Sequence, residues 1–344
     1  LTYADFTAAG LPVDGIDPRR LSIYNRGVEQ AIQIQGEGDG IFDRGDRVHF
    51  YAQGIDMTDP DAIYTEENVY WLTVEDHNGL RMATRDVTPI NSDPTPQHFP
   101  THLQLEEDTA YWRAMPDGEG QDHWFWGGLL SPNTENVAAA RPYTLTLNAP
   151  VGDAGVATVR VKLKGYTTGA HRTRIRINGE IVDDAHWAGQ AGFEHFAAFD
   201  PGLLWDGDNV LLVEALESGA RPDQLLVNWV EIDYHQAYRA DDNQLHFGAP
   251  GTGPYQFTVN GFDDPAVDVY DISDQTAPVR LEYGEIADTA AGMDSVANIA
   301  DGVDATFAVA TSYTLRFSDN AQVMSAYLAL AQDRYRTPAR VQLD

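Results

Sequence analysis

The chain has 344 residues, and its 53 Asp and Glu residues against 22 Lys and Arg residues give a formal net charge of −31. A field of one sign this strong repels nucleic acid and anionic membrane surfaces, so we expect neither as a partner. The chain has no cysteine, which excludes disulfides, zinc–thiolate sites and thiol catalysis within it, and no stretch approaches the roughly 20 apolar residues of a membrane span.

Asp-Gly and Asn-Gly pairs punctuate the chain between short runs of alternating apolar and polar residues. The pairs begin at Asp14, Asn78, Asp39, Asp117, Asn178, Asp206, Asn260 and Asp301. Both dipeptides tolerate the positive φ of tight turns, so between strand-like runs they predict hairpins. We therefore expect an all-β, multidomain protein of antiparallel β-sandwich or jelly-roll domains with short helical turns.

Residues 1–90 are predicted to form a small β domain. Residues 1–10 can make one or two helical turns, ended by Gly10 as a left-handed cap. The alternating strands that follow are expected at 21–24, 31–35, 47–52 and 68–74. The chain begins without Met inside this segment, and we expect it to be a processed or excised piece of something longer.

Residues 91–140 are predicted to be a proline- and aromatic-rich linker or junction. Prolines crowd residues 89–101, at Pro89, Pro94, Pro96 and Pro100. Because proline fixes φ and lacks an amide donor, a sheet interior does not accept that density, and we expect an extended connection here.

Residues 141–236 carry the clearest domain signal, a β-sandwich of jelly-roll type. Strict alternation marks the runs 143–147, 157–163, 172–177, 209–216 and 225–234, and alternation means one buried and one solvated face. Residues 237–344 are predicted to form a C-terminal β domain, with strands at 255–259, 267–272, 306–310 and 313–317. The run 325–331 fits helix or strand equally.

An acidic cluster lies in the loop before the strand at 47–52. It consists of Glu37, Asp39, Asp43 and Asp46, spaced among glycines. Oxygen ligands around a glycine-permitted bend suit Ca²⁺, so a calcium site is one hypothesis. The loop misses the EF-hand pattern, since Ile41 stands at the fifth position and no glutamate at the twelfth. A solvated acidic hairpin is the other interpretation.

An aromatic cluster follows the proline segment. Its members are Tyr111, Trp112, Asp122, His123, Trp124 and Trp126. The flat rings could stack on sugar rings, with Asp122 and His123 as polar partners, which would make a glycan platform. Tyr and Trp also suit the sealing of a domain junction, because their polar tips find hydrogen-bond partners.

The remaining ionisable residues form no recognisable catalytic motif. The histidines show no His-Glu-x-x-His or other short paired spacing, and His186, His195 and His235 fit surface or strand positions. The carboxylate pairs Asp183-Asp184 and Asp241-Asp242 fit solvated turns. No nucleophile elbow or phosphate-binding loop occurs. A glycoside hydrolase would need two carboxylates facing one cleft, which sequence spacing does not reveal.

Several segments together resemble the β-rich region that precedes the catalytic domain of gingipain-like secreted cysteine peptidases of bacteria. They are residues 21–29, 40–51, 68–72, 122–126, 206–209 and 227–234. The resemblance implies export, an extracellular or cell-surface location, and a C-terminal catalytic domain in the parent protein. Without cysteine this chain has no counterpart of that family's nucleophile, so no catalytic residue is carried over.

Two functions follow as hypotheses. The first is a non-catalytic pro-region, scaffold or targeting region of an exported gingipain-like peptidase. The second is an extracellular structural or adhesive protein, such as a surface-layer or filament subunit or a glycan-binding module, in which strand edges pair between subunits.

Overall fold

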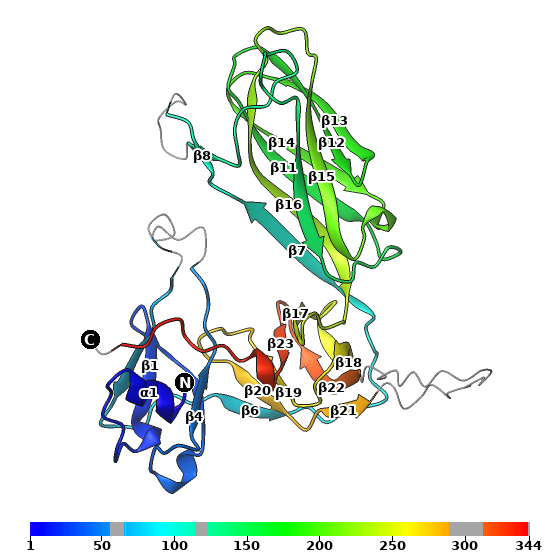
Figure 1. Cartoon of the computed structure of the whole chain (residues 1–344). Helices are drawn as coiled ribbons and strands as arrows, with labels where there is room; N and C mark the ends of the chain where they lie inside the picture. Colours follow the sequence, from blue (N-terminus) through cyan, green and yellow to red (C-terminus); the bar gives the residue numbers. More distant parts are fainter. Residues whose placement is uncertain (56–64, 66, 114–122, 289–311, 343–344) are drawn as a thin grey trace, which may run out of the picture. The chain divides into compact units, whose positions relative to one another are not determined.

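The computed structural model describes residues 1–55, 65, 67–113, 123–288 and 312–342. The chain divides into two compact units (Figure 1): the first combines Leu1–Pro96 with Ala240–Asp344, and the second is Gln97–Arg239. Strands are the main regular elements of both units, as predicted. None of the helices in the described part is long and apolar enough to cross a membrane.

The second unit is a sandwich of two four-stranded antiparallel sheets. One sheet has the order β10-β15-β12-β13, with bounds Ala140–Leu147, Gly207–Leu216, Ala170–Ile177 and Glu180–Ala188. The other has the order β14-β11-β16-β7, with bounds Gly192–Phe199, Ala157–Gly165, Leu225–Ala237 and His98–Glu106. A 3₁₀ turn, η4 (Pro201–Leu203), precedes β15.

Alternating side chains build the core of this sandwich. Along β11, Val159, Val161 and Leu163 are at most 1% exposed, while Arg160 and Lys162 between them reach the solvent. Fully burying one such aliphatic side chain contributes about 1.5–3 kcal/mol. The predicted turn at Asn178 is confirmed, because Asn178 and Gly179 both have positive φ and join β12 to β13.

The prediction of a linker at residues 89–101 is wrong over its last residues. Strand β7 begins at His98 and includes Pro100, which pairs with His235 of β16. β7 is an edge strand of its sheet, and an edge tolerates a residue without an amide proton. The proline-rich segment therefore contains both a connection and, at Pro100, part of an edge strand.

The first unit begins with a short helix and two small sheets. Helix α1 (Tyr3–Ala8) starts at a capping box formed by Thr2 and Asp5 and is followed by Gly10 at positive φ, as predicted. The strands are β1, β2 and β5 in one sheet and β3 and β4 in the other: Leu21–Asn25, Val28–Gln30, Trp71–Val74, Ile32–Gln35 and Arg47–Phe50. The 3₁₀ turn η1 (Pro18–Arg20) precedes β1, and η2 (Glu37–Asp39) lies between β3 and β4.

Two further sheets complete the first unit. The five-stranded order β17-β23-β19-β20-β6 has bounds Gln244–Gly248, Ala326–Ala331, Val267–Asp271, Val279–Glu282 and Ala83–Asp86. The order β18-β22-β21 has bounds Gly253–Phe262, Tyr313–Ala321 and Glu285–Asp288. Phe247, Phe257, Phe317 and Tyr327 pack between them, with ring centroids 5.1–6.2 Å apart. Residues 326–331, left open between helix and strand, are strand β23, followed by η6 (Gln332–Arg334).

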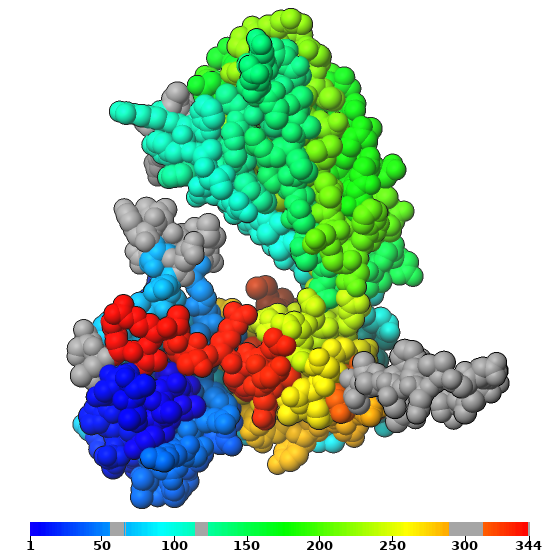
Figure 2. Space-filling model, viewed as in Figure 1, coloured from blue at the N-terminus to red at the C-terminus, as the bar shows by residue number. Residues whose placement is uncertain are grey.

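The two ends of the sequence meet in the first unit. β6 pairs in parallel with β20, so residues of the N-terminal part complete a sheet of the C-terminal part. The red C-terminal residues also lie over the blue N-terminal ones (Figure 2), and the ring of Tyr335 stacks on His49 at 4.5 Å. The sequence divides these parts into separate domains at 1–90 and 237–344, whereas the structure groups them. The strand expected at 306–310 lies outside the described residues.

Candidate functional site

A pair of short strands in the second unit carries the exposed residues of the predicted aromatic cluster. β8 (Ala110–Tyr111) pairs with β9 (Trp124–Phe125) so that Tyr111 stands directly opposite Trp124. The Trp112 amide donates to the His123 carbonyl at 2.8 Å and prolongs the ribbon by one residue. Because directly opposed residues point to the same face, Tyr111 and Trp124 share one face of this ribbon.

That shared face is open to solvent. Tyr111 is 55% and Trp124 43% exposed, although both are large apolar rings. Their ring centroids are 5.1 Å apart, and the half-buried His123 ring stacks on Tyr111 at 5.7 Å. His123 Nδ1 lies 3.0 Å from the carbonyl oxygen of Trp112, a contact that orients the imidazole. We call Tyr111, His123 and Trp124 the aromatic surface.

The other predicted aromatic residues point inward and are not part of this surface. Trp112 packs on Tyr166 at 5.2 Å, in a small cluster with the buried Phe125 and Leu226. Trp126 packs against the main core of the sandwich, and its carbonyl accepts hydrogen bonds from Arg141 and Tyr143. Asp122 lies outside the described residues. Thus three of the six predicted residues come together, and two serve packing inside the unit.

Each carboxylate of the acidic loop in the first unit has a separate partner. Glu37 accepts from Arg81 Nε at 2.8 Å. Asp39 accepts from the amide of Ile41, and Asp43 from the amide of Gly45. Asp46 is 5% exposed and accepts from the amide of Asp43 at 3.1 Å.

These contacts are hydrogen bonds that close turns, and one ion pair. They are the contacts expected of an acidic hairpin, the alternative to a calcium site. Across the described residues, no group of three or more His, Asp or Glu side chains is placed to hold a metal ion. The calcium site therefore stays a prediction. A Ca²⁺-dependent rise in melting temperature that Asp39→Asn abolishes would support it.

Two buried polar networks inside the sandwich were not predicted from the sequence. In one, His195 Nδ1 lies 2.6 Å from Asp183 Oδ2, and its Nε2 lies 2.6 Å from Thr173 Oγ1. Thr173 also accepts from the indole of Trp187 at 3.0 Å. In the other, His171 contacts Asp223 at 2.6 Å. Burial lowers the pKa of His195, with Asp183 acting in the opposite direction.

The Thr173–His195–Asp183 chain has the order of a nucleophile, a base and an orienting carboxylate. Thr173 is 0% exposed and His195 1% exposed, so a substrate has no path to the hydroxyl. The network instead satisfies polar groups inside the sandwich, where an unpaired one would be costly.

Asp183 and Asp184 lie in strand β13, and the prediction that they occupy a solvated turn is wrong. Asp184 is bound by Arg172 and Arg174 of the neighbouring strand β12, at 2.7–3.0 Å. The Arg172 hydrogen bonds, with a further contribution from Arg174, lower the pKa of Asp184 to about 2.

No protein-family model matches the chain, and no curated protein matches it in sequence. Among solved structures it is similar to dimeric latent PorU from Porphyromonas gingivalis, with a TM-score of 0.62 and 12% identity. The match covers 98% of this chain and 31% of that chain, so this chain spans about a third of the PorU chain. At this identity the match shows a shared fold.

Smaller parts of the chain align with carbohydrate-binding modules. One is a CBM36-1 domain of a multidomain xylanase from the hindgut metagenome of Trinervitermes trinervoides, with a TM-score of 0.25, 12% identity, and coverage of 38% of this chain and 96% of that one. Another is a CBM36 module in complex with calcium and xylotriose, with a TM-score of 0.24, 12% identity, and coverage of 38% and 98%. TM-scores this low support no inference about carbohydrate binding, which has to be argued from the residues of this chain alone.

Proposed function

We propose that this chain is a non-catalytic β region of an exported, gingipain-like cysteine peptidase of bacteria, and that it acts as a pro-region or scaffold for a catalytic domain. The observation that carries the proposal is the fold shared with PorU over nearly the whole chain. The sequence adds to this its resemblance to the gingipain-like family in the segments named above.

The extent of the match supports a role beside a catalytic domain. This chain accounts for 31% of the PorU chain, so most of PorU consists of other domains. PorU was solved in a latent form. A non-catalytic region can contribute to latency by covering the active site of a neighbouring catalytic domain. We assign this masking role to the present chain.

The chemistry inside the chain agrees with a supporting role. A cysteine peptidase needs a thiolate nucleophile, and the chain has no cysteine. The hydrogen-bond chain that most resembles a catalytic one, Thr173–His195–Asp183, is enclosed in the sandwich.

Hydrolysis of Arg and Lys ester substrates by the pure chain tests the non-catalytic part of this proposal. We expect no hydrolysis above that of buffer. Activity that persists through several purification steps and disappears when Thr173→Val is introduced would contradict it. Thr173→Val keeps the shape of the side chain but removes the hydroxyl, so a loss of activity in a variant that circular dichroism shows to be folded would point to this one group.

The aromatic surface favours a second candidate, a glycan-binding module at the cell surface. Tyr111 and Trp124 offer flat rings to solvent on one face of a ribbon. Rings of this kind stack on the apolar faces of sugars, and the half-buried His123 supplies a polar partner beside them.

Affinity electrophoresis in gels that contain soluble polysaccharide tests this second function. Retardation of the wild-type chain, lost in Trp124→Ala and Tyr111→Ala, supports it. Trp205→Ala is the matched control, because Trp205 is 58% exposed elsewhere on the same unit. Equal mobility of all four proteins in xylan, mannan and glucan gels would exclude this function for these polysaccharides.

A further inference from the structure

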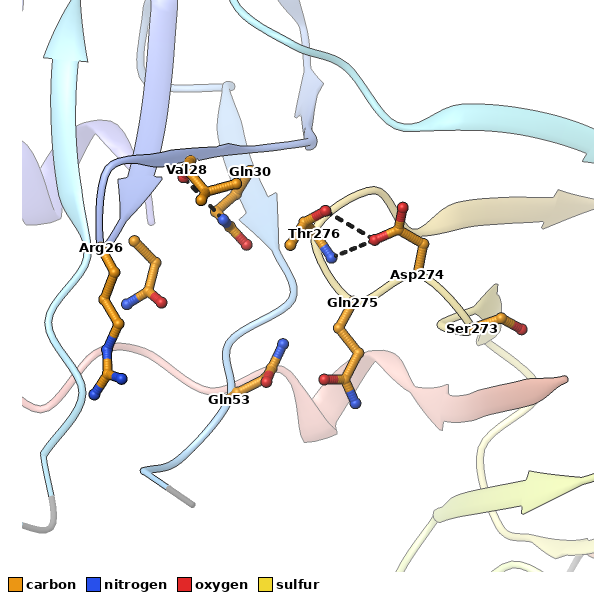
Figure 3. A pocket seen from close by; sticks show the side chains of 9 residues that line it. Arg26, Val28, Gln30, Gln53, Ser273, Asp274, Gln275 and Thr276 are labelled. Carbon is orange, nitrogen blue, oxygen red and sulfur yellow. Dashed lines mark hydrogen bonds between the residues drawn. The ribbon is translucent and has the colours of Figure 1, made fainter. Parts of the chain in front are cut away.

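The first unit has a polar groove whose lining includes no residue of the aromatic surface or the acidic loop. The groove has a volume of about 720 Å³ and is lined by Val28 and Gln30 of strand β2, by Asn25 and Arg26 at the turn between β1 and β2, by Gln53 and by the segment 273–276. Figure 3 shows side chains from these segments directed toward one space. The two sides are tied together where the Ala31 amide donates to the Thr276 carbonyl at 2.8 Å.

One wall of the groove is the edge of a sheet. β2 is the terminal strand in the order β2-β1-β5, so β1 occupies only one of its sides. The Ala31 amide, which binds Thr276, points to the other side. Because backbone groups two residues apart in an extended chain point to the same side, the N–H and C=O of Glu29 also face outward there.

Carboxamide groups stand around this edge. Gln53 and Gln275 project from two different segments (Figure 3), and among the described residues neither side-chain amide has a recorded hydrogen-bond partner. Each carboxamide offers both a donor and an acceptor, which is the combination that a peptide backbone requires. Val28 lines the same wall and is 52% exposed, an apolar surface for a side chain of the ligand.

Other lining residues already have partners in the first unit: Asn25 Nδ2 donates to Asn68 Oδ1, and Gln30 Nε2 donates to the Val28 carbonyl. Asp274 accepts from the amide and hydroxyl of Thr276 at 3.0 and 2.8 Å, so its carboxylate holds the shape of the wall. The groove also has no aromatic ring among its lining residues. Glycan sites depend on such rings, whereas an open strand edge binds an added strand through its main chain.

We propose that this groove binds an extended peptide segment, which adds a strand to the outer edge of β2. The backbone of Glu29 pairs with the main chain of the peptide, and the carboxamides of Gln53 and Gln275 bind its remaining amide and carbonyl groups. Recognition through the main chain makes the site tolerant of peptide sequence, with one preference for an apolar residue at Val28.

The experiment begins with selection of a random peptide library displayed on phage against the whole chain. The best peptide is then synthesised with a fluorophore, and its Kd is measured by fluorescence anisotropy. Gln53→Leu and Gln275→Leu each replace one carboxamide by a shorter, branched apolar side chain. Gln104→Leu, on the exposed side of β7 in the second unit, is the matched control.

A second pair of variants isolates the strand edge. Glu29→Pro removes the backbone N–H and also the carboxylate that accepts from the Leu80 amide at 2.7 Å. Glu29→Ala removes only that carboxylate, so the difference between the two variants reports the N–H. Circular dichroism and the melting temperature establish that each variant is folded.

We expect each Gln→Leu variant in the groove to weaken binding about five- to tenfold, as loss of one hydrogen bond does. Glu29→Pro should bind about tenfold more weakly than Glu29→Ala, and Gln104→Leu like the wild type. The proposal is overturned if selection yields no peptide, or if the selected peptide binds all folded groove variants as tightly as the wild type. Binding of oligosaccharides that Gln275→Leu abolishes would overturn it as well.

Discussion

Asp183 Oδ2 lies 2.6 Å from His195 Nδ1, and the imidazole is fully enclosed between the two sheets of the sandwich. The carboxylate keeps partial contact with solvent, since 30% of its side chain is exposed. A histidine held in this way links the stability of the sandwich to pH, because protonation would place a charge in the interior.

We predict that the chain loses stability as the pH falls below the ordinary histidine pKa of 6.5. Burial lowers the pKa of His195 in the folded state, and it does the same for His49 and His246. The unfolded chain therefore binds more protons than the folded one just below pH 6.5. The stabilisation that comes from keeping these histidines neutral is fully present above pH 6.5. It declines as the pH drops through 6.5 toward the pKa values of the folded state.

Urea unfolding at about pH 7.5 and about pH 5.5 measures this effect. His195→Gln should make the free energy of unfolding less dependent on pH over this window, whatever it does to the stability at neutral pH. The acidic side chains with lowered pKa, such as Asp184 and Asp233, titrate in a lower range. An identical pH dependence in wild type and His195→Gln would contradict the assignment to His195.

Arg85 joins two sheets of the first unit, and its removal should destabilise that unit. Its guanidinium Nη2 lies 2.7 Å from Asp271 Oδ2 and 2.6 Å from Asp319 Oδ2. The Asp319 side chain is only 9% exposed and also accepts from the Tyr327 hydroxyl at 2.9 Å. Arg85→Met would leave both carboxylates without their cation, and because the guanidinium itself is 37% exposed we expect a cost of about 1–3 kcal/mol in the free energy of unfolding.

Arg19→Met is the matched control for Arg85→Met. Arg19 pairs with Asp17 at the surface, with exposures of 51% and 30%, and such pairs contribute less than about 1 kcal/mol. Urea unfolding of the two variants gives the comparison. Equal losses for both would show that the Arg85 bridge contributes no more than a surface pair.

Gly165→Ala should destabilise the sandwich by about 1–3 kcal/mol, the usual cost of overpacking. A Cβ at this position would lie 1.9 Å from the Gly189 carbonyl oxygen, a backbone atom that cannot move aside alone. Gly38→Ala is the control, since its Cβ would meet nothing within 4 Å. Thermal unfolding compares them, and equal melting temperatures for Gly165→Ala and wild type would contradict this packing.

Local pattern was enough to predict most of the strands. In β11 and β12 the alternation of apolar and charged residues fixes which face is buried, and Asn178-Gly179 fixes the hairpin. Asn260-Gly261 carries the same dipeptide but forms a bulge inside β18, because its flanking residues pair with β22 rather than with each other. A dipeptide therefore permits a turn, and long-range pairing decides whether one forms.

Contacts between distant segments could not be read from the sequence. The pairing of β6 with β20 joins residues about 200 positions apart. Asp183, His195 and Thr173 meet because β12, β13 and β14 stack across two sheets. In the aromatic segment, the pairing of β8 with β9 turns Tyr111 and Trp124 outward and Phe125 inward, a division that residue type alone does not give.

The central claim is that this chain supports a peptidase domain, and binding to such a domain tests it most directly. The gingipain-like catalytic domain of the same organism is produced as a separate chain, and the complex is measured by isothermal titration calorimetry. We predict one-to-one binding, together with slower hydrolysis of Arg or Lys esters by the catalytic domain when the chain is added. No heat of binding, and an unchanged rate of hydrolysis at saturating chain, would contradict the account.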